Sequence, residues 1–130
     1  MQFNQIQNPD LYLITDYSAS RVTINGIPHH TGLILRPTAL HSDWSLTDLD
    51  ALVPQDHLQW LLTAPPEILI LGTGARQAFP RREIWRELRQ MQPWGVEIMN
   101  TPAACRTYNL IASEGRDVAA ALLIAHGEHG

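Results

Sequence analysis

The sequence predicts a single α/β domain with three layers, in which flanking helices cover a central mixed sheet of about five strands. Segment 95–123 reads as strand, turn, capped helix, glycine and strand. The expected element order is three N-terminal strands followed by α-β-α-β-α-β, and this alternation favours parallel pairing in a covered sheet. Because 130 residues fit one domain, we expect a single domain over 1–130, with a core at about 11–124 and a flexible tail at 125–130.

The N-terminal strands are predicted from apolar runs on either side of a turn signal. Leu11–Thr15 is the first expected strand. Arg21–Asn25 and Pro28–Leu35 flank Asn25-Gly26, a dipeptide that favours a tight turn because both residues tolerate a positive φ. These two strands are expected to form an N-terminal β-hairpin.

The middle of the chain is expected to contain one irregular stretch and one short helix. Residues 38–47 are polar, and we expect Trp44 to pack there as a plug. Pro54 opens a helix that runs through Leu62, because proline is favoured at the first helical position. Its apolar side is formed by Leu58, Leu61 and Leu62. The tripeptide Ala64-Pro65-Pro66 ends this helix.

A strand and a helix follow. Glu67–Leu71 is a short apolar run of the kind found in the middle of a covered sheet. The next helix begins at Pro80 and ends before Pro93. Its apolar side chains repeat at i, i+4 and i+7 and therefore share one face. They are Ile84, Leu88 and Met91, with Trp85 beside them.

Segment 95–123 is expected to complete the sheet. Val96–Met99 is its first strand, and Thr101 is predicted to be the N-cap of the following helix because its hydroxyl can accept a hydrogen bond from a backbone N–H. Pro102 then occupies the first helical position. Gly115 can end the helix in the left-handed conformation. Val118–Ile124 is apolar enough to be buried on both faces.

The composition excludes several kinds of chemistry. All nine basic residues are arginine, so a lysine Schiff base, a pyridoxal phosphate linkage and a P-loop lysine are excluded. The net charge of −4 argues against nonspecific nucleic-acid binding. Cys105 is the only cysteine, which excludes an intrachain disulfide and a cysteine-based zinc site. No secretory signal and no membrane-spanning apolar run is visible, so a cytoplasmic protein is expected.

A candidate binding site lies beyond the carboxyl ends of two predicted strands, where open α/β sheets collect their ligands. The helix after the second strand would direct N–H groups and its positive dipole end into the crevice between the loops. An arginine there could hold a carboxylate or phosphate in a bidentate manner. The predicted anion or small-molecule pocket consists of Gly72, Thr73, Gly74, Arg76, Thr101 and Arg106. The alternative is that both glycines only satisfy backbone geometry and that the threonine only caps the helix.

Other motifs favour structural roles. The run 72–77 resembles only the first half of a dinucleotide fingerprint, because Gln77 replaces the third glycine. Cys105 shares a helix face with Tyr108 and Ala112, so we expect a buried thiol that alkylates slowly; the alternative is a thiol activated near the helix N-terminus. The six histidines form no metal motif. We expect no metal and no cofactor.

The arginines are concentrated in residues 76–89. This segment holds Arg76, Arg81, Arg82, Arg86 and Arg89, opposed by Glu83 and Glu87. One interpretation is a solvated helix face with offsetting i,i+4 pairs. The other is a surface for a protein partner, and the region around Trp44 and Trp60 is a second such candidate, although tryptophans in a domain of this size are more often core.

Three sequence segments together resemble a small family of poorly characterised proteins. They are RVTINGIPHHTGLILRP (21–37), PEILILGTG (66–74) and the segment 95–123. The family includes mitochondrial complex I assembly factor 3 and many bacterial members of unknown function, and the resemblance extends over roughly residues 12–124. It implies an α/β domain with a mixed sheet. The usual family pattern has an aspartate where this chain has Asn100, which weakens the case for a catalytic carboxylate there.

Two functions from different classes follow from these observations. The first is a non-enzymatic binding or assembly factor with a protein partner, an accessory to respiratory-complex assembly as the resemblance implies. The second is a small-molecule enzyme or sensor that uses the crevice through Thr73, Arg76, Thr101 and Cys105. No catalytic residue is identified, and nucleic-acid binding is disfavoured. The oligomeric state stays open.

Overall fold

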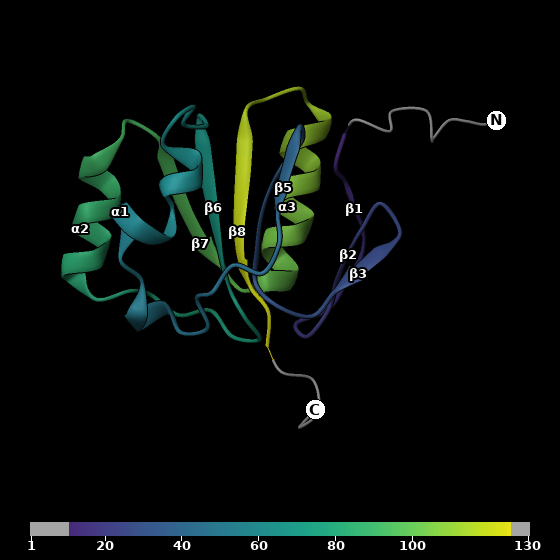
Figure 1. Ribbon diagram of the computed structural model, residues 1–130, viewed down its shortest axis with the longest axis horizontal. Helices are drawn as coiled ribbons and strands as arrows, with labels where there is room; N and C mark the ends of the chain where they lie inside the picture. The colour runs from purple at the N-terminus through teal and green to yellow at the C-terminus, as the bar shows by residue number, and fades with distance from the viewer. Residues whose placement is uncertain (1–10, 126–130) are drawn as a thin grey trace.

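The computed structural model describes residues 11–125, which form two β-sheets and three α-helices (Figure 1). The strands are β1 (Ile14–Tyr17), β2 (Val22–Ile24), β3 (Ile27–His29), β4 (Leu33–Arg36), β5 (Ala39–His41), β6 (Ile68–Thr73), β7 (Gly95–Met99) and β8 (Val118–Leu123). The helices are α1 (Pro54–His57), α2 (Arg82–Met91) and α3 (Thr101–Ser113), with two short 3-10 turns, η1 (Leu49–Ala51) and η2 (Gln59–Leu61).

The larger sheet is mixed and has the strand order β5-β4-β8-β6-β7. β6 pairs in parallel with β7 and β8, whereas β4 pairs antiparallel with β8 and β5. Figure 1 shows α1 and α2 on one face of this sheet and α3 on the other. The prediction of a three-layer α/β domain with a mixed, five-stranded central sheet is therefore confirmed.

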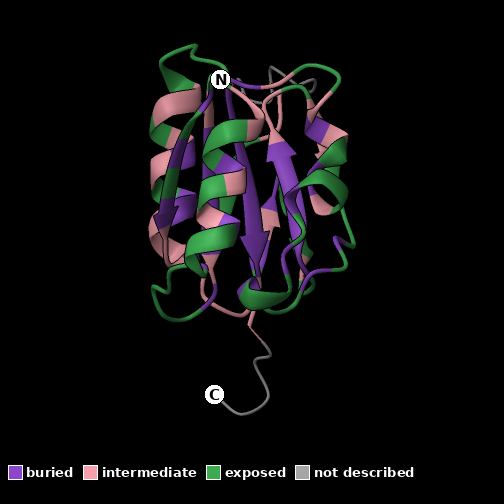
Figure 2. Ribbon diagram, turned by 90° about the vertical axis from the view of Figure 1, so that its left-hand side faces the viewer, coloured by how far each residue is buried: buried purple, intermediate pink, exposed green. Residues whose placement is uncertain are grey.

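The larger sheet is buried on both faces, because successive side chains of a strand point to opposite sides. In β6, Leu69 and Leu71 belong to the apolar cluster that includes the inner face of α2. Ile70, which lies between them, belongs to the cluster that includes Cys105 and Tyr108 of α3. Figure 2 shows the buried strands behind a helix whose outer surface is exposed. Because both faces of β6 are covered, its residues from Ile68 to Leu71 are all apolar.

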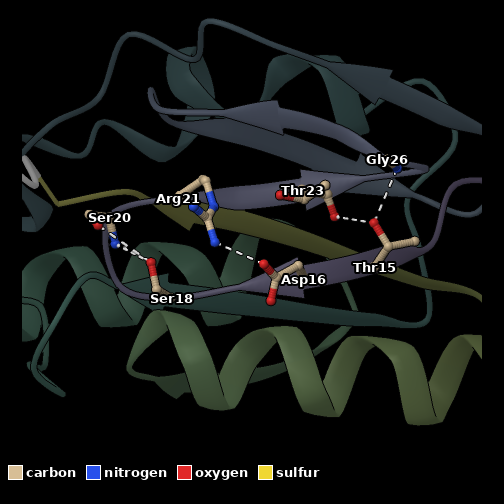
Figure 3. Close-up of polar contacts among 7 residues, drawn as sticks. All are labelled: Thr15, Asp16, Ser18, Ser20, Arg21, Thr23 and Gly26. Atoms are coloured by element: carbon tan, nitrogen blue, oxygen red, sulfur yellow. Dashed lines mark hydrogen bonds and ion pairs between the residues drawn. The ribbon is translucent and has the colours of Figure 1, made fainter.

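The N-terminal strands form a second, three-stranded antiparallel sheet in the order β1-β2-β3. Asn25 and Gly26 join β2 to β3 with φ of 50° and 84°, which confirms the predicted turn. Polar contacts bind β1 to β2 (Figure 3), where the Thr15 hydroxyl donates to the Thr23 carbonyl at 3.3 Å and accepts from the Gly26 N–H at 3.1 Å. Arg21 forms an ion pair with Asp16 at 2.8 Å beside them. This sheet packs its apolar face into the α3 cluster.

The prediction of one strand over Pro28–Leu35 is wrong. The chain leaves the small sheet at the end of β3 and enters the large one at the start of β4, passing through Gly32. A Cβ at Gly32 would lie 3.0 Å from the Trp44 carbonyl oxygen and 3.2 Å from that of Leu122. Two other backbone segments thus crowd the crossing point, and a contact between distant segments divides what reads locally as one strand.

Residues 38–47 are not wholly irregular, since they contain β5, which pairs antiparallel with β4. The packing of Trp44 as a plug is confirmed: its side chain is buried, and its Nε1 donates to the His57 carbonyl at 2.7 Å. The helix predicted from Pro54 to Leu62 breaks after α1, because Leu58 leaves the helical region at φ −112° and ψ 12°. The first strand begins at Ile14, three residues after the predicted start at Leu11. The second helix, α2, begins at Arg82, two residues after the predicted start at Pro80. Of the predicted tail, residues 126–130 lie outside the described residues.

Candidate functional site

Two loops meet at the carboxyl end of the parallel strands, where the predicted pocket lies. One begins at Gly72 and Thr73, the last residues of β6, and the other joins β7 to α3 through Asn100. In the sheet, Gly72 is opposite Met99 of β7 on one side and Leu122 of β8 on the other. Neighbouring parallel strands therefore bring the two loops together, as the sequence analysis expected.

The prediction that Thr101 is the N-cap of α3 is wrong. Asn100 occupies that position with φ −65° and ψ 162°, and its side-chain oxygen accepts a hydrogen bond from the Ala103 N–H at 2.8 Å. Asparagine and threonine are both favoured N-caps, so residue type alone did not distinguish the two positions. Thr101 is instead the first helical residue and is completely buried. An aspartate at position 100 could make the same cap, which gives that position a structural role.

Thr101 connects the two loops and the end of β8. The Gly74 N–H donates to Oγ1 of Thr101 at 2.8 Å, and the Thr101 N–H donates to the Gly74 carbonyl at 2.8 Å. The Thr101 hydroxyl donates in turn to the Leu123 carbonyl at 2.5 Å. One hydroxyl thus satisfies a buried donor on one segment and a buried acceptor on another, and buried polar groups require such partners.

The N-terminus of α3 has its first N–H groups paired within the chain. Those of Thr101 and Ala103 donate to Gly74 and to the Asn100 side chain. Ala104 donates to the Asn100 carbonyl, and Pro102 has no N–H to donate. A helix N-terminus holds an anion through unpaired N–H groups. Positions 101–104 of α3 therefore offer an anion the helix dipole but no unpaired N–H.

The space over Gly72 is filled. A Cβ at Gly72 would lie 2.8 Å from Cδ2 of Leu122 and 2.9 Å from Oγ1 of Thr101. Gly72 is thus required for close packing between β6, β8 and the start of α3. Gly74 has a different requirement, since its φ of 95° disfavours other residues. Packing explains the glycine at position 72, and backbone conformation explains the glycine at position 74. The alternative interpretation of this motif gives the glycines such a structural role.

The other predicted site residues lie at the edge of this arrangement. Thr73 is half-buried, and its hydroxyl donates to the carbonyl of Arg76 at 2.5 Å. The side chains of Arg76 and Arg106 are exposed, and neither forms an ion pair with any residue between 11 and 125. The structure thus brings Gly72, Gly74 and Thr101 into contact and leaves the arginines in solvent. An anion pocket at this end stays a prediction, and it would depend on the two guanidinium groups.

Cys105 is buried on the side of α3 that faces the sheet, as expected. Burial raises the pKa of its thiol to about 12, and the positive charge of Arg106 lowers that pKa only in part. A thiolate is the reactive form of cysteine, so this position disfavours nucleophilic chemistry. Burial also raises the pKa of the Tyr108 hydroxyl, which donates to the Tyr12 carbonyl at 2.9 Å. Both side chains therefore belong to the core.

Gln77 also belongs to this region, and no role for it is predicted from the sequence. Its side-chain Nε2 donates to the carbonyl of Ile98 at 3.1 Å, on β7. β7 is the last strand in the order of the larger sheet, so the bond ties the loop after β6 to an edge strand. No local signal marks it, because its partner lies 21 positions away.

The two predicted partner surfaces differ in exposure. Trp44 is 5% exposed and belongs to the core, while Trp60 is partly buried and stacks on His41 with ring centroids 5.4 Å apart. The outer side of α2, by contrast, is exposed and carries arginines. No helix in the described part of the chain has the length and apolar character to cross a membrane. Within residues 11–125, no three His, Cys, Asp or Glu side chains cluster as metal ligands would.

Comparison with known proteins gives a family and a fold. The sequence pattern of the family described as "Protein of unknown function (DUF498/DUF598)" matches residues 14–123. The chain is 33% identical to a Xanthomonas campestris protein solved by NMR, with a TM-score of 0.81 over 100% of this chain and 97% of that one. It is 27% identical to a Bordetella pertussis protein described as a Mth938-like domain, with a TM-score of 0.74 over 95% and 92% of the two chains.

Two relatives have names that bear on function. A Francisella tularensis subsp. holarctica (strain LVS) protein named "13 kDa major membrane protein" is 30% identical over 95% of this chain and 98% of its own length. The Danio rerio protein named "NADH dehydrogenase (ubiquinone) 1 alpha subcomplex assembly factor 3" is 36% identical over 85% of this chain. This chain covers only 63% of the Danio rerio protein, so more than a third of that relative has no counterpart in this chain.

Proposed function

The chain belongs to the family of unknown function DUF498/DUF598, and we propose that it is a binding protein that assists the assembly of a protein complex. The resemblance found in the sequence is thereby confirmed as family membership. The observation that carries the proposal is the similarity to proteins named as assembly factor 3 of an NADH dehydrogenase subcomplex. An accessory role in respiratory-complex assembly is the finer form of the proposal.

The geometry at the carboxyl end of the sheet supports a binding role. This end is where α/β proteins hold substrates, and here it is packed by the chain's own groups. Thr101 fills the approach to Gly72, and its hydroxyl is committed to Gly74 and Leu123. The buried thiol of Cys105 has a pKa raised to about 12. A function carried out on the outer surface accords with a sheet end closed in this way.

The second candidate function is the binding of a small anion at the same end of the sheet. The observation that favours it is the exposure of Arg76 and Arg106 in the absence of an ion pair with any described residue. A guanidinium can bind carboxylate or phosphate through two parallel hydrogen bonds. The positive end of the α3 dipole would add to the attraction. In this form the pocket would be a shallow surface site.

The test is quantitative affinity purification of the tagged protein from the cells it comes from, with soluble and membrane fractions analysed separately. We expect enrichment of the subunits of one defined assembly, relative to a purification with the tag alone. Folded protein that recovers no partner from either fraction contradicts the assembly role. The two fractions also test the predicted cytoplasmic location, which the name of the Francisella relative opposes. Recovery mainly in the membrane fraction would overturn that location.

A further inference from the structure

The outer side of α2 and the segment before it form a cationic surface with one exposed and one half-buried aromatic side chain. We define this arginine–aromatic surface by Phe79, Arg82, Trp85, Arg86 and Arg89. Ile84 and Leu88 face the core from α2, and its arginines lie on the outward side. Trp85 lies between these two sides and is half-buried. In Figure 2, α2 faces the viewer with this side exposed.

The charge of this region is opposite to that of the whole protein. Segment 76–89 holds five arginines and two glutamates, a net charge of +3 in a chain whose net charge is −4. The sequence suggested that Glu83 and Glu87 would offset the arginines in ion pairs. Within residues 11–125, however, the ion pairs lie elsewhere, and none includes an arginine of α2. The arginines are therefore available to carboxylates from another molecule.

A hollow adjoins these charges. It has a volume of about 460 Å³ and is lined by Phe79, Pro80, Arg82 and Trp85. Phe79 is 70% exposed, which is unusual for a side chain that gains so much from burial. Cζ of the Arg89 guanidinium lies over the Trp85 ring, 5.4 Å from its centre. The surface thus offers a depression with aromatic walls and a cationic rim, in which Trp85 is half-buried. Trp and Arg are the side chains enriched at interface hot spots.

We propose that the arginine–aromatic surface binds an acidic segment of the partner protein, which inserts an apolar side chain into the hollow beside Phe79 and Trp85. This inference rests on the proposed function and specifies the surface that performs it. The cationic rim provides charge complementarity to aspartates and glutamates on the partner, and such complementarity favours the encounter and the correct register. The aromatic walls provide the apolar area that a single anchoring side chain would bury.

A protein segment fits this surface better than an anionic membrane. Glu83 and Glu87 lie among the arginines, and a membrane surface of one charge would bring both glutamates against lipid headgroups of the same sign. A peptide can place its carboxylates opposite the arginines and avoid the glutamates. The hollow also accepts an individual side chain, whereas helices that bind membranes present a continuous apolar face to the lipid.

The first experiment places the photo-cross-linking residue p-benzoylphenylalanine at position 79 in the cells of origin. We expect a cross-link to another protein, mapped by mass spectrometry to a segment that is rich in Asp and Glu and contains an apolar residue. The matched control carries the same residue at position 110, where Leu110 is 61% exposed on α3, and should not capture that segment. A cross-link only to lipid, only to a second copy of the chain, or to a segment without acidic residues overturns the proposal.

The second experiment compares recovery of the partner by variants that alter the charge or the aromatic wall of this surface. We expect Arg82→Glu and Phe79→Ala each to reduce recovery by about tenfold or more, the range of interface hot spots. The control Arg116→Glu lies outside this surface and should leave recovery unchanged, because the exposed pair of Arg116 with Glu67 contributes little to stability. Vesicles of phosphatidylglycerol and phosphatidylcholine form a separate arm. If the unaltered protein sediments with these vesicles and Arg82→Glu does not, the surface binds a membrane and the protein-segment proposal is overturned.

These results separate failure of the surface from failure of the function. If the unaltered protein and both variants recover the same partner equally, the assembly role stands and this surface is not its binding site. If the unaltered protein recovers no partner, the assembly role itself fails. Circular dichroism of each variant checks that the fold is retained, which we expect because Phe79 and Arg82 are exposed.

Discussion

The side chain of Asn109 bonds both backbone groups of Ile14, which lies 95 positions earlier in the chain. Its Oδ1 accepts from the Ile14 N–H at 3.1 Å, and its Nδ2 donates to the Ile14 carbonyl at 2.7 Å. An asparagine on α3 thus satisfies the backbone of β1 as a neighbouring strand would. The two sheets are joined through this helix, with the Tyr108 hydroxyl adding a bond to the Tyr12 carbonyl beside it.

Replacing Asn109 should loosen the small sheet without unfolding the large one. Asn109→Ala leaves both backbone groups of Ile14 without their partner, at a cost of about 1–3 kcal/mol. We expect hydrogen exchange at the Ile14 amide and in β1 and β2 to accelerate by about tenfold or more, because local opening becomes easier. The control Leu110→Ala, at an exposed position of the same helix, should leave this exchange unchanged. Equal acceleration in β6 and β8 would contradict a local effect.

The Thr101 hydroxyl should be essential for stability. Thr101→Val keeps the shape of the side chain but leaves the Gly74 N–H and the Leu123 carbonyl without their partner. We expect the free energy of unfolding in urea to fall by about 2–4 kcal/mol. Thr101→Ser retains the hydroxyl and loses one methyl group, so its loss should be about 1 kcal/mol. Similar losses for both variants would assign the effect to packing and not to the hydrogen bonds.

Two glycines in neighbouring strands should respond differently to alanine. At Gly72 a Cβ would meet Leu122 and Thr101 at less than van der Waals distance, and we expect Gly72→Ala to reduce the free energy of unfolding by about 1–3 kcal/mol. At Gly95 such a Cβ would approach the Glu67 carbonyl oxygen no closer than 4.0 Å. Gly95→Ala should therefore be neutral or stabilising by up to about 1 kcal/mol. Denaturant melts of both variants test this, and equal effects would show that the crowding at Gly72 is relieved by side-chain movement.

Cys105 should destabilise the fold at alkaline pH. Its pKa is raised to about 12 in the folded protein, against about 8.5 in an unfolded chain. Below pH 8 the thiol is protonated in both states and has no effect. As the pH rises above the unfolded pKa, only the unfolded state loses the proton, and stability falls. Between pH 8 and pH 10 this amounts to about 2 kcal/mol.

The measurement compares the unaltered protein with Cys105→Ala at both pH values. As the pH rises from 8 to 10, the free energy of unfolding of the unaltered protein should fall relative to that of Cys105→Ala by about 2 kcal/mol. A difference that does not change with pH would mean that the thiol is accessible to water. Fast alkylation of the native protein at neutral pH would lead to the same conclusion.

Phosphate distinguishes the two candidate functions. If the assembly role is the whole function, phosphate should raise the melting temperatures of the unaltered protein and of Arg76→Ala by the same amount. Exclusion of phosphate from protein surfaces stabilises folded proteins without a specific site, and the α3 N–H groups are paired. An additional rise that Arg76→Ala abolishes would support the surface anion site. The control is Arg21→Ala, which removes an exposed arginine directly before β2 and should retain any such rise.

Local sequence patterns are sufficient to predict the fold class and most of the buried strands. Apolar runs such as 118–124 identify strands covered on both faces, because each residue of such a strand faces a core. Asn25-Gly26 identified a turn through its local φ preference, and the helical period of Cys105 and Tyr108 identified a buried face. These properties depend on neighbours within about one helical turn or one strand.

Other features depend on contacts between segments that are distant in the chain. The division between β3 and β4 depends on the carbonyl groups that surround Gly32. The choice of Asn100 over Thr101 as N-cap depends on a hydroxyl bond to Leu123, 22 positions away. The hydroxyl of the same threonine lies 2.9 Å from where a Cβ at Gly72 would be. A residue's type shows which groups its side chain can bind. Which group it does bind depends on the folded structure, because packing brings one partner within hydrogen-bond distance and keeps the others away.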